Sequence, residues 1–126
     1  MEMRSGAVRF RLPLQERLQA SMNWIRIASA HDLDDDEVMG INVGGARVAL
    51  YRSDGEFFAT DNRCTHAEAL MSDGYLEDGC IECPLHQARF DIRTGKALCA
   101  PATQDLRTYA VRRDGDEIFI ADPAVA

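Results

Sequence analysis

The sequence predicts an all-β fold, an antiparallel β-sandwich built from short strands. Glycine-containing turn pairs recur along the chain at regular spacing, and no stretch between them has the length and periodicity of a long amphipathic helix. The chain has 126 residues, 46% of them hydrophobic, which is the size of one domain with one modest core. Short strands joined by closely spaced turns are typical of β-sandwiches and barrels.

The individual strands are placed by apolar or alternating runs between these turns. Gly44-Gly45 between two such runs predicts a two-residue hairpin, and the acidic run over residues 34–37 is expected to be a solvated loop. In chain order, the predicted strands are Met22–Ile27, Val38–Val43, Ala46–Arg52, Glu56–Thr60, Tyr75–Glu77, Cys80–Cys83, Arg89–Arg93, Lys96–Leu98, Thr108–Arg113 and Glu117–Ala121.

Residues 1–21 have the character of an extension upstream of the domain, which we place at residues 22–126. Leu14, Leu18 and Met22 recur at four-residue spacing and predict a short helix over about residues 14–21. The extension lacks the apolar segment of a secretory signal, and nowhere does the sequence contain eighteen consecutive apolar residues. We therefore expect a cytoplasmic protein that does not span a membrane.

The charge balance restricts the classes of partner. The formal net charge is −7 at pH 7, which argues against binding to nucleic acid or to anionic membranes, because both require basic patches. An acidic surface of this size can steer encounters with a basic patch on a partner protein, or it can simply keep a small protein soluble.

Two short couplets carry the chemistry of the chain. Cys64-Thr65-His66 reads C-x-H and Cys83-Pro84-Leu85-His86 reads C-x-x-H, and both fall in predicted loops, over residues 61–72 and 83–90. Two thiolates and two imidazoles in paired couplets are the ligand set of a Rieske [2Fe–2S] cluster, in which His replaces Cys on one of the two irons. The candidate ligands are therefore Cys64, His66, Cys83 and His86.

Other uses of these residues fit the pattern less well. Cys80 and Cys83 form a C-x-x-C that, with nearby ligands, would allow a zinc-stabilised binding module without redox function. The single-residue spacing of Cys64 and His66 does not fit a zinc knuckle, and nucleophilic Cys/His catalysis would leave the doubled couplet unexplained. We expect Cys80 and Cys99 to pack as small buried hydrophobic residues rather than to form a disulfide.

The two ligand segments, with residues 71–77 and 94–101, resemble the Rieske-type ferredoxins of bacterial ring-hydroxylating dioxygenases, in particular the naphthalene and nitroarene branch. The similarity covers about residues 22–120. It implies a Rieske-type antiparallel sandwich with a small cluster-binding subdomain of two ligand loops. In that scheme Cys64 and Cys83 bind the inner iron, and His66 and His86 bind the outer iron near the surface.

The resemblance also implies a role. The chain would be an electron-transfer component rather than an enzyme, carrying one [2Fe–2S] cluster as a monomer between an NAD(P)H-dependent reductase and a terminal oxygenase. Partners would dock over the cluster tip, so we expect Pro84, Leu85 and Gln87 to surround the docking site. The nearest alternative is the small Rieske subunit of an assimilatory nitrite reductase. A terminal oxygenase is excluded because only His31 is left for its catalytic iron site.

Overall fold

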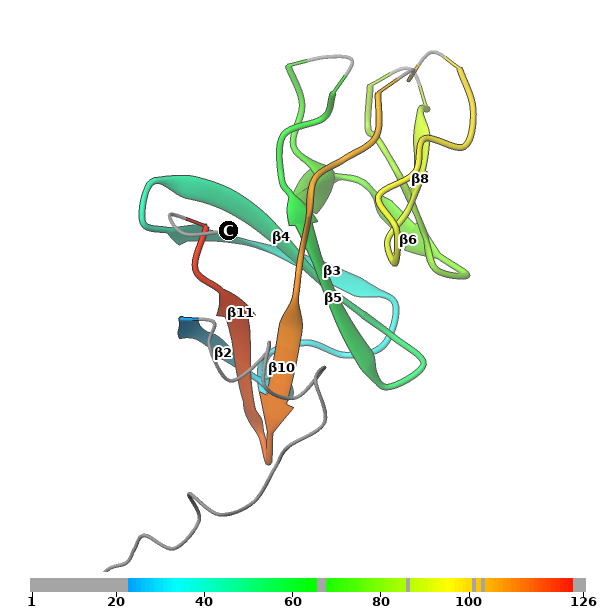
Figure 1. Ribbon diagram of the computed structural model, residues 1–126. Coiled ribbons are helices and arrows are strands. Elements are labelled where there is room, and N and C mark those ends of the chain that lie inside the picture. Colours follow the sequence, from blue (N-terminus) through cyan, green and yellow to red (C-terminus); the bar gives the residue numbers. More distant parts are fainter. Residues whose placement is uncertain (1–22, 66–67, 86, 101, 103, 124–126) are drawn as a thin grey trace, which may run out of the picture.

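The described residues form three antiparallel sheets, as predicted for an all-β chain (Figure 1). The computed structural model describes residues 23–123 except 66, 67, 86, 101 and 103. The strands are β2 (Trp24–Ser29), β3 (Glu37–Val43), β4 (Ala46–Ser53), β5 (Glu56–Asp61), β6 (Tyr75–Glu77), β7 (Cys80–Glu82), β8 (Arg89–Asp91), β9 (Thr108–Tyr109), β10 (Val111–Asp114) and β11 (Glu117–Ala121), with short 3₁₀ helices η2 (Ala30–Asp32) and η3 (Met71–Asp73).

The sheet β3-β4-β5-β9 lies at the centre of the fold. Along β4 the buried side chains alternate between two cores. Val48 and Leu50 pack with the sheet β10-β11-β2, and Ala49 and Tyr51 pack toward the sheet β6-β7-β8. Because successive side chains of a strand point to opposite faces, one central strand closes both cores. The first core belongs to the sandwich, and the second joins the sandwich to the small subdomain.

Most predicted turns and strands are confirmed. The hairpin of β3 and β4 turns at Gly44 and Gly45, both with positive φ, as a two-residue loop requires. The predicted strands over residues 75–77 and 117–121 coincide with β6 and β11. The predicted helix over residues 14–21, the start of the first strand at Met22 and the extension itself lie outside the described residues.

Two strand predictions are wrong, and several others differ from the observed strands by one or two residues at an end. Residues 96–98 do not form a strand, since only the isolated bridge Phe90–Ala97 pairs there and the Ala97 N–H donates to the Asp105 carboxylate instead. The run over residues 108–113 is two strands, because the chain changes sheets at Ala110. β9 pairs with β5, whereas β10 pairs with β11.

The three segments nearest the predicted site lie at one end of the molecule. These are the chain between β5 and η3, the loop between β7 and β8, and the chain between β8 and β9 (upper part of Figure 1). Within the described ranges, no helix has the length and hydropathy needed to cross a bilayer.

Candidate metal centre

The first ligand loop is closed at its base by backbone pairing. It begins where β5 ends, and the Cys64 N–H donates to the Ala69 carbonyl at 2.9 Å, next to a bridge between Arg63 and Leu70. Below it, the buried Asn62 side chain accepts from the Ser72 N–H at 2.7 Å and donates to the Ser72 hydroxyl at 3.0 Å. The loop is therefore fixed to the sandwich on the side of η3.

The second ligand loop is built in the same way. It joins β7 to β8, and the Cys83 N–H donates to the Ala88 carbonyl at 2.7 Å. In each loop the cysteine thus pairs with an alanine five residues later. Gln87 has a φ of 59°, an unusual conformation for a residue other than glycine, which lets the second loop turn back into β8.

The two loops bring their cysteines into contact. Cys64 and Cys83 are buried, and their thiols are within hydrogen-bond contact of each other. The Leu85 backbone N–H donates to the Cys83 sulfur. Burial raises the pKa of the Cys83 thiol to about 11, and the neighbouring Cys64 adds to this effect, whereas the Leu85 amide opposes it. A pair of inward-facing sulfurs with an amide donor fits a shared iron centre, whose positive charge stabilises thiolates.

The structure describes two of the four predicted ligands. The sequence prediction brings Cys64 and Cys83 together, and so does the structure, whereas His66 and His86 lie outside the described residues. None of the four cysteines forms a disulfide. Cys80 is partly buried on β7, but Cys99 is exposed, so the prediction of a buried Cys99 is wrong. It is exposed because the predicted strand is not formed, and Cys99 lies in the loop beyond Ala97.

A third loop, over residues 97–106, supports both ligand loops and was not predicted from the sequence. The Thr65 hydroxyl donates to the Gln104 carbonyl at 2.8 Å, and the Leu98 N–H donates to the Arg89 carbonyl at 2.8 Å. Leu98 and Leu85 are 47% and 44% exposed, so two apolar side chains reach the surface at this end of the molecule. Gly95, just before this loop, is the one residue of the sequence that indicates it. Its φ is positive, and a side chain there would clash with the Leu106 carbonyl, so the chain can pass this closely only with glycine.

A hydrogen-bonded network of hydroxyl groups lies beneath the first ligand loop. Tyr51 and Thr60 join their hydroxyls at 2.7 Å inside the core, and the Tyr109 hydroxyl donates to the Asp61 carboxylate at 2.5 Å. Burial raises the pKa of Tyr51 above its usual range. Burial also raises the pKa of Tyr109 to about 12, with the Asp61 hydrogen bond adding to the shift. Both phenols therefore keep their protons in the folded protein at alkaline pH values at which a free tyrosine ionises.

We expect the folded protein to lose stability at alkaline pH through these phenols. In the unfolded chain they ionise near pH 10, whereas in the folded protein Tyr109 keeps its proton up to about pH 12. Their contribution is therefore complete below pH 10 and is lost as the pH rises toward 12. Urea unfolding of the wild type and of Tyr109→Phe between pH 8 and 11.5 measures it. The variant should show the shallower decline, and equal slopes would contradict the assignment.

Comparison with known proteins identifies the family. The model of the Rieske [2Fe-2S] domain matches residues 23–110. Over 100 residues, 79% of this chain and 96% of the relative, the sequence is 50% identical to the ferredoxin component of the naphthalene 1,2-dioxygenase/salicylate 5-hydroxylase systems of a Ralstonia species. The chain belongs to the Rieske ferredoxins of aromatic-ring dioxygenase systems. It is thus an electron-transfer component rather than a catalytic subunit, and its cofactor is one Rieske-type [2Fe–2S] cluster.

Solved structures agree with this assignment. The Rieske ferredoxin is 35% identical to the ferredoxin of carbazole 1,9a-dioxygenase from Nocardioides aromaticivorans, with a TM-score of 0.77 over 79% of this chain and 98% of that one. It is 34% identical, with a TM-score of 0.74 over 78% and 92% of the two chains, to a chain in a complex of reduced oxygenase and oxidised ferredoxin of carbazole 1,9a-dioxygenase. The predicted fold class and family are confirmed, and the zinc-module and nitrite reductase alternatives are set aside.

Proposed function

We propose that Cys64, His66, Cys83 and His86 hold the [2Fe–2S] cluster, and that the ferredoxin carries electrons from an NAD(P)H-dependent reductase to the terminal oxygenase of an aromatic-ring dioxygenase. The observation that carries the proposal is the contact of two buried cysteines from two matched loops at one end of the β-sandwich. When bound, such a cluster takes up and releases one electron at a time.

Other residues of the chain position the ligand loops and shield the sulfurs. The backbone pairing at Cys64 and Cys83 holds the two ligand loops in register, and the shared core keeps water from the sulfurs. Residues 22–126 constitute the working domain in this proposal, and residues 1–21 have no assigned part. We infer a monomer, since one chain carries both ligand loops, and the cytoplasmic location stays a prediction.

The oxygenase is the partner that the comparisons favour, because a related chain is part of an oxygenase–ferredoxin complex. We propose that the partner docks over the loop end, where Pro84, Leu85 and Gln87 are exposed. Leu98 of the third loop is a further exposed apolar side chain. Apolar residues at the centre of a contact supply binding energy by losing contact with water.

Reconstitution with a reductase and the terminal oxygenase of naphthalene 1,2-dioxygenase tests the function. Addition of the wild-type ferredoxin should make NADH oxidation depend on naphthalene and O₂. Leu85→Glu and Gln87→Glu should slow this reaction about tenfold or more, because a charge must be desolvated at the contact. Ala110→Glu, exposed at the crossing from β9 to β10, is the matched control and should be neutral. No response to the wild-type ferredoxin would refute the function, and full rates for both loop variants would refute the docking site.

We expect a reduction potential at the low end of the Rieske range, on the order of −150 mV. In the high-potential Rieske proteins, as the resemblance implies, hydroxyl side chains at the places of Ala88 and Phe90 stabilise the reduced state. Here both residues are fully buried and neither has a side-chain donor. Phe90→Tyr should therefore raise the potential by about 20 to 60 mV, given a hydrogen bond worth about 0.5 to 1.5 kcal/mol. Protein-film voltammetry measures both values, and a wild-type potential above zero would contradict the proposal.

A further inference from the structure

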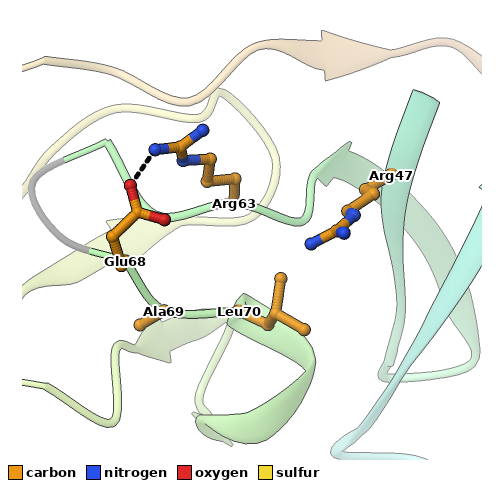
Figure 2. Close-up of a pocket in the computed structure, with 5 residues that line it drawn as sticks. All are labelled: Arg47, Arg63, Glu68, Ala69 and Leu70. Atoms are coloured by element: carbon orange, nitrogen blue, oxygen red, sulfur yellow. Dashed lines mark hydrogen bonds and ion pairs between the residues drawn. The ribbon is translucent and has the colours of Figure 1, made fainter. Parts of the chain in front are cut away.

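A polar hollow lies beside the first ligand loop, outside the predicted docking residues (Figure 2). It has a volume of about 140 Å³ and is lined by Arg47, Arg63, Glu68, Ala69 and Leu70. Arg47 extends from β4, whereas the other four residues belong to the first ligand loop and its base. Figure 2 shows the Arg47 side chain reaching toward the space above Leu70, while Arg63 turns to Glu68.

The two arginines differ in their pairing. Arg63 donates to the Glu68 carboxylate, but both side chains are well exposed, at 65% and 83%, so this ion pair contributes little and can be exchanged. Within the part of the chain that the structure describes, Arg47 has no carboxylate in ion-pair range. Arg26, Arg93 and Arg113, which lie away from the ligand loops, pair with Glu117, Glu56 and Asp116. Among the described residues, the exposed Arg89 and Arg112 resemble Arg47 in having no such pair, but neither lines this hollow.

The floor beside Arg47 is rigid. A second hollow shares Arg47 and Leu70 with the first and continues over Gly40 and Asn62. The Asn62 side chain is fixed by two hydrogen bonds to Ser72. A Cβ on Gly40 would lie 2.7 Å from the Asn62 amide nitrogen, so a larger residue there would displace this hydrogen-bonded side chain. The two hollows together form a groove beside Arg47. This groove is preformed, so a ligand group that enters it does not have to reorganise the backbone.

The chemistry of the groove selects an acidic side chain. Two guanidinium groups at a hollow of this size match a carboxylate, which each of them can bind with paired hydrogen bonds. The net charge of −7 makes a long-range attraction to an acidic protein unfavourable, so such a contact would act locally and fix orientation. Arg63 directly precedes the loop cysteine Cys64, so the hollow lies at the base of the first ligand loop, within reach of a protein that docks over the ligand loops.

We propose that the groove between Arg47 and Arg63 receives an aspartate or glutamate side chain of the terminal oxygenase and sets the orientation in which the oxygenase docks. This inference depends on the proposed function. The oxygenase is chosen over the reductase because an oxygenase is the partner in the complex of a related chain. Glu68 occupies the place of the partner carboxylate in the free ferredoxin and releases Arg63 on docking.

The test is equilibrium binding of the cluster-loaded ferredoxin to the terminal oxygenase of naphthalene 1,2-dioxygenase, measured by calorimetry at several salt concentrations. Arg47→Glu should weaken binding roughly tenfold or more and reduce its dependence on salt, whereas Arg47→Lys should keep most of the affinity. Arg112→Glu is the matched control, since Arg112 is exposed on β10 and the charge change is the same. It should stay within about twofold of the wild type.

The spectrum and reduction potential of Arg47→Glu should equal those of the wild type, because Arg47 is not among the proposed ligands. Equal binding by Arg47→Glu and Arg112→Glu would overturn the inference. The inference would also be overturned if Arg47→Glu slowed only the transfer of electrons from the reductase to the ferredoxin and left binding to the oxygenase unchanged. If the wild type itself neither binds nor reduces the oxygenase, the proposed function fails and the inference with it. If the wild type binds and reduces the oxygenase but Arg47→Glu binds as tightly as Arg112→Glu, this inference fails and the proposed function stands.

Discussion

Cys83→Ser will yield a folded protein without the visible absorption of an iron–sulfur cluster and without the rhombic paramagnetic resonance signal of a reduced Rieske centre. The same loss is expected for Cys64→Ser, His66→Ala and His86→Ala. The reason is the donor set, because each iron of a Rieske cluster takes two protein ligands and removing one opens the site. For Cys64 and Cys83 the sulfurs are buried in contact with each other, so no other side chain can replace them without moving a loop.

The other two cysteines provide matched controls for this experiment. Cys80→Ser, on β7, and Cys99→Ser, in the third loop, change the same atom outside the proposed ligand set. Both variants should keep the full iron content and an unchanged resonance spectrum. Cluster loss in Cys80→Ser, together with retention in Cys64→Ser, would show that the C-x-x-C pair rather than the couplets binds the iron.

Phe90→Ala will lower the free energy of unfolding by about 3 to 5 kcal/mol, the usual range for deleting a buried phenylalanine. Phe90 is fully buried on β8, opposite Ile81 of β7, in the core that also contains both loop cysteines. The vacated space cannot be filled by the alanine at position 97, the bridge partner of Phe90 on the other side. Urea unfolding of the cluster-loaded protein, followed by circular dichroism, measures the change.

Arg89→Ala is the control for this second prediction. Arg89 precedes Phe90 on the same strand but is exposed, so its truncation should change stability by no more than about 0.5 kcal/mol. A loss of less than about 1 kcal/mol for Phe90→Ala would mean that the core around the cysteines is loosely packed. In that case burial would not explain the raised pKa of the Cys83 thiol.

The features that could be predicted from the sequence are those with a local cause. Gly44 and Gly45 adopt positive φ, a conformation that glycine adopts without strain, so the hairpin follows from two neighbouring residues. The two Cys/His couplets can likewise be recognised locally, because in each of them the His follows the Cys by only two or three residues. Cys64 and Cys83 could be placed in one site because a paired ligand set requires both of them at the same cluster.

The features that were missed have causes far away in the sequence. Thr65 is held by a backbone carbonyl 39 residues later, and nothing around Gln104 indicates this contact. Cys99 has an apolar neighbourhood in the sequence, yet it is exposed because the preceding segment gives its backbone donor to Asp105 instead of to a strand. The division of residues 108–113 depends on which sheet each half joins, and this is decided by β5 and β11.

The burial of β4 on both of its faces affects how the protein unfolds. Val48 and Leu50 belong to the sandwich core, while Ala49 and Tyr51 belong to the core that holds the ligand cysteines. Withdrawing this one strand would open both cores at once, so the two halves have little opportunity to melt separately. Thermal damage to the sandwich would then release iron in the same cooperative transition, and a partly unfolded carrier that still holds its cluster would be scarcely populated.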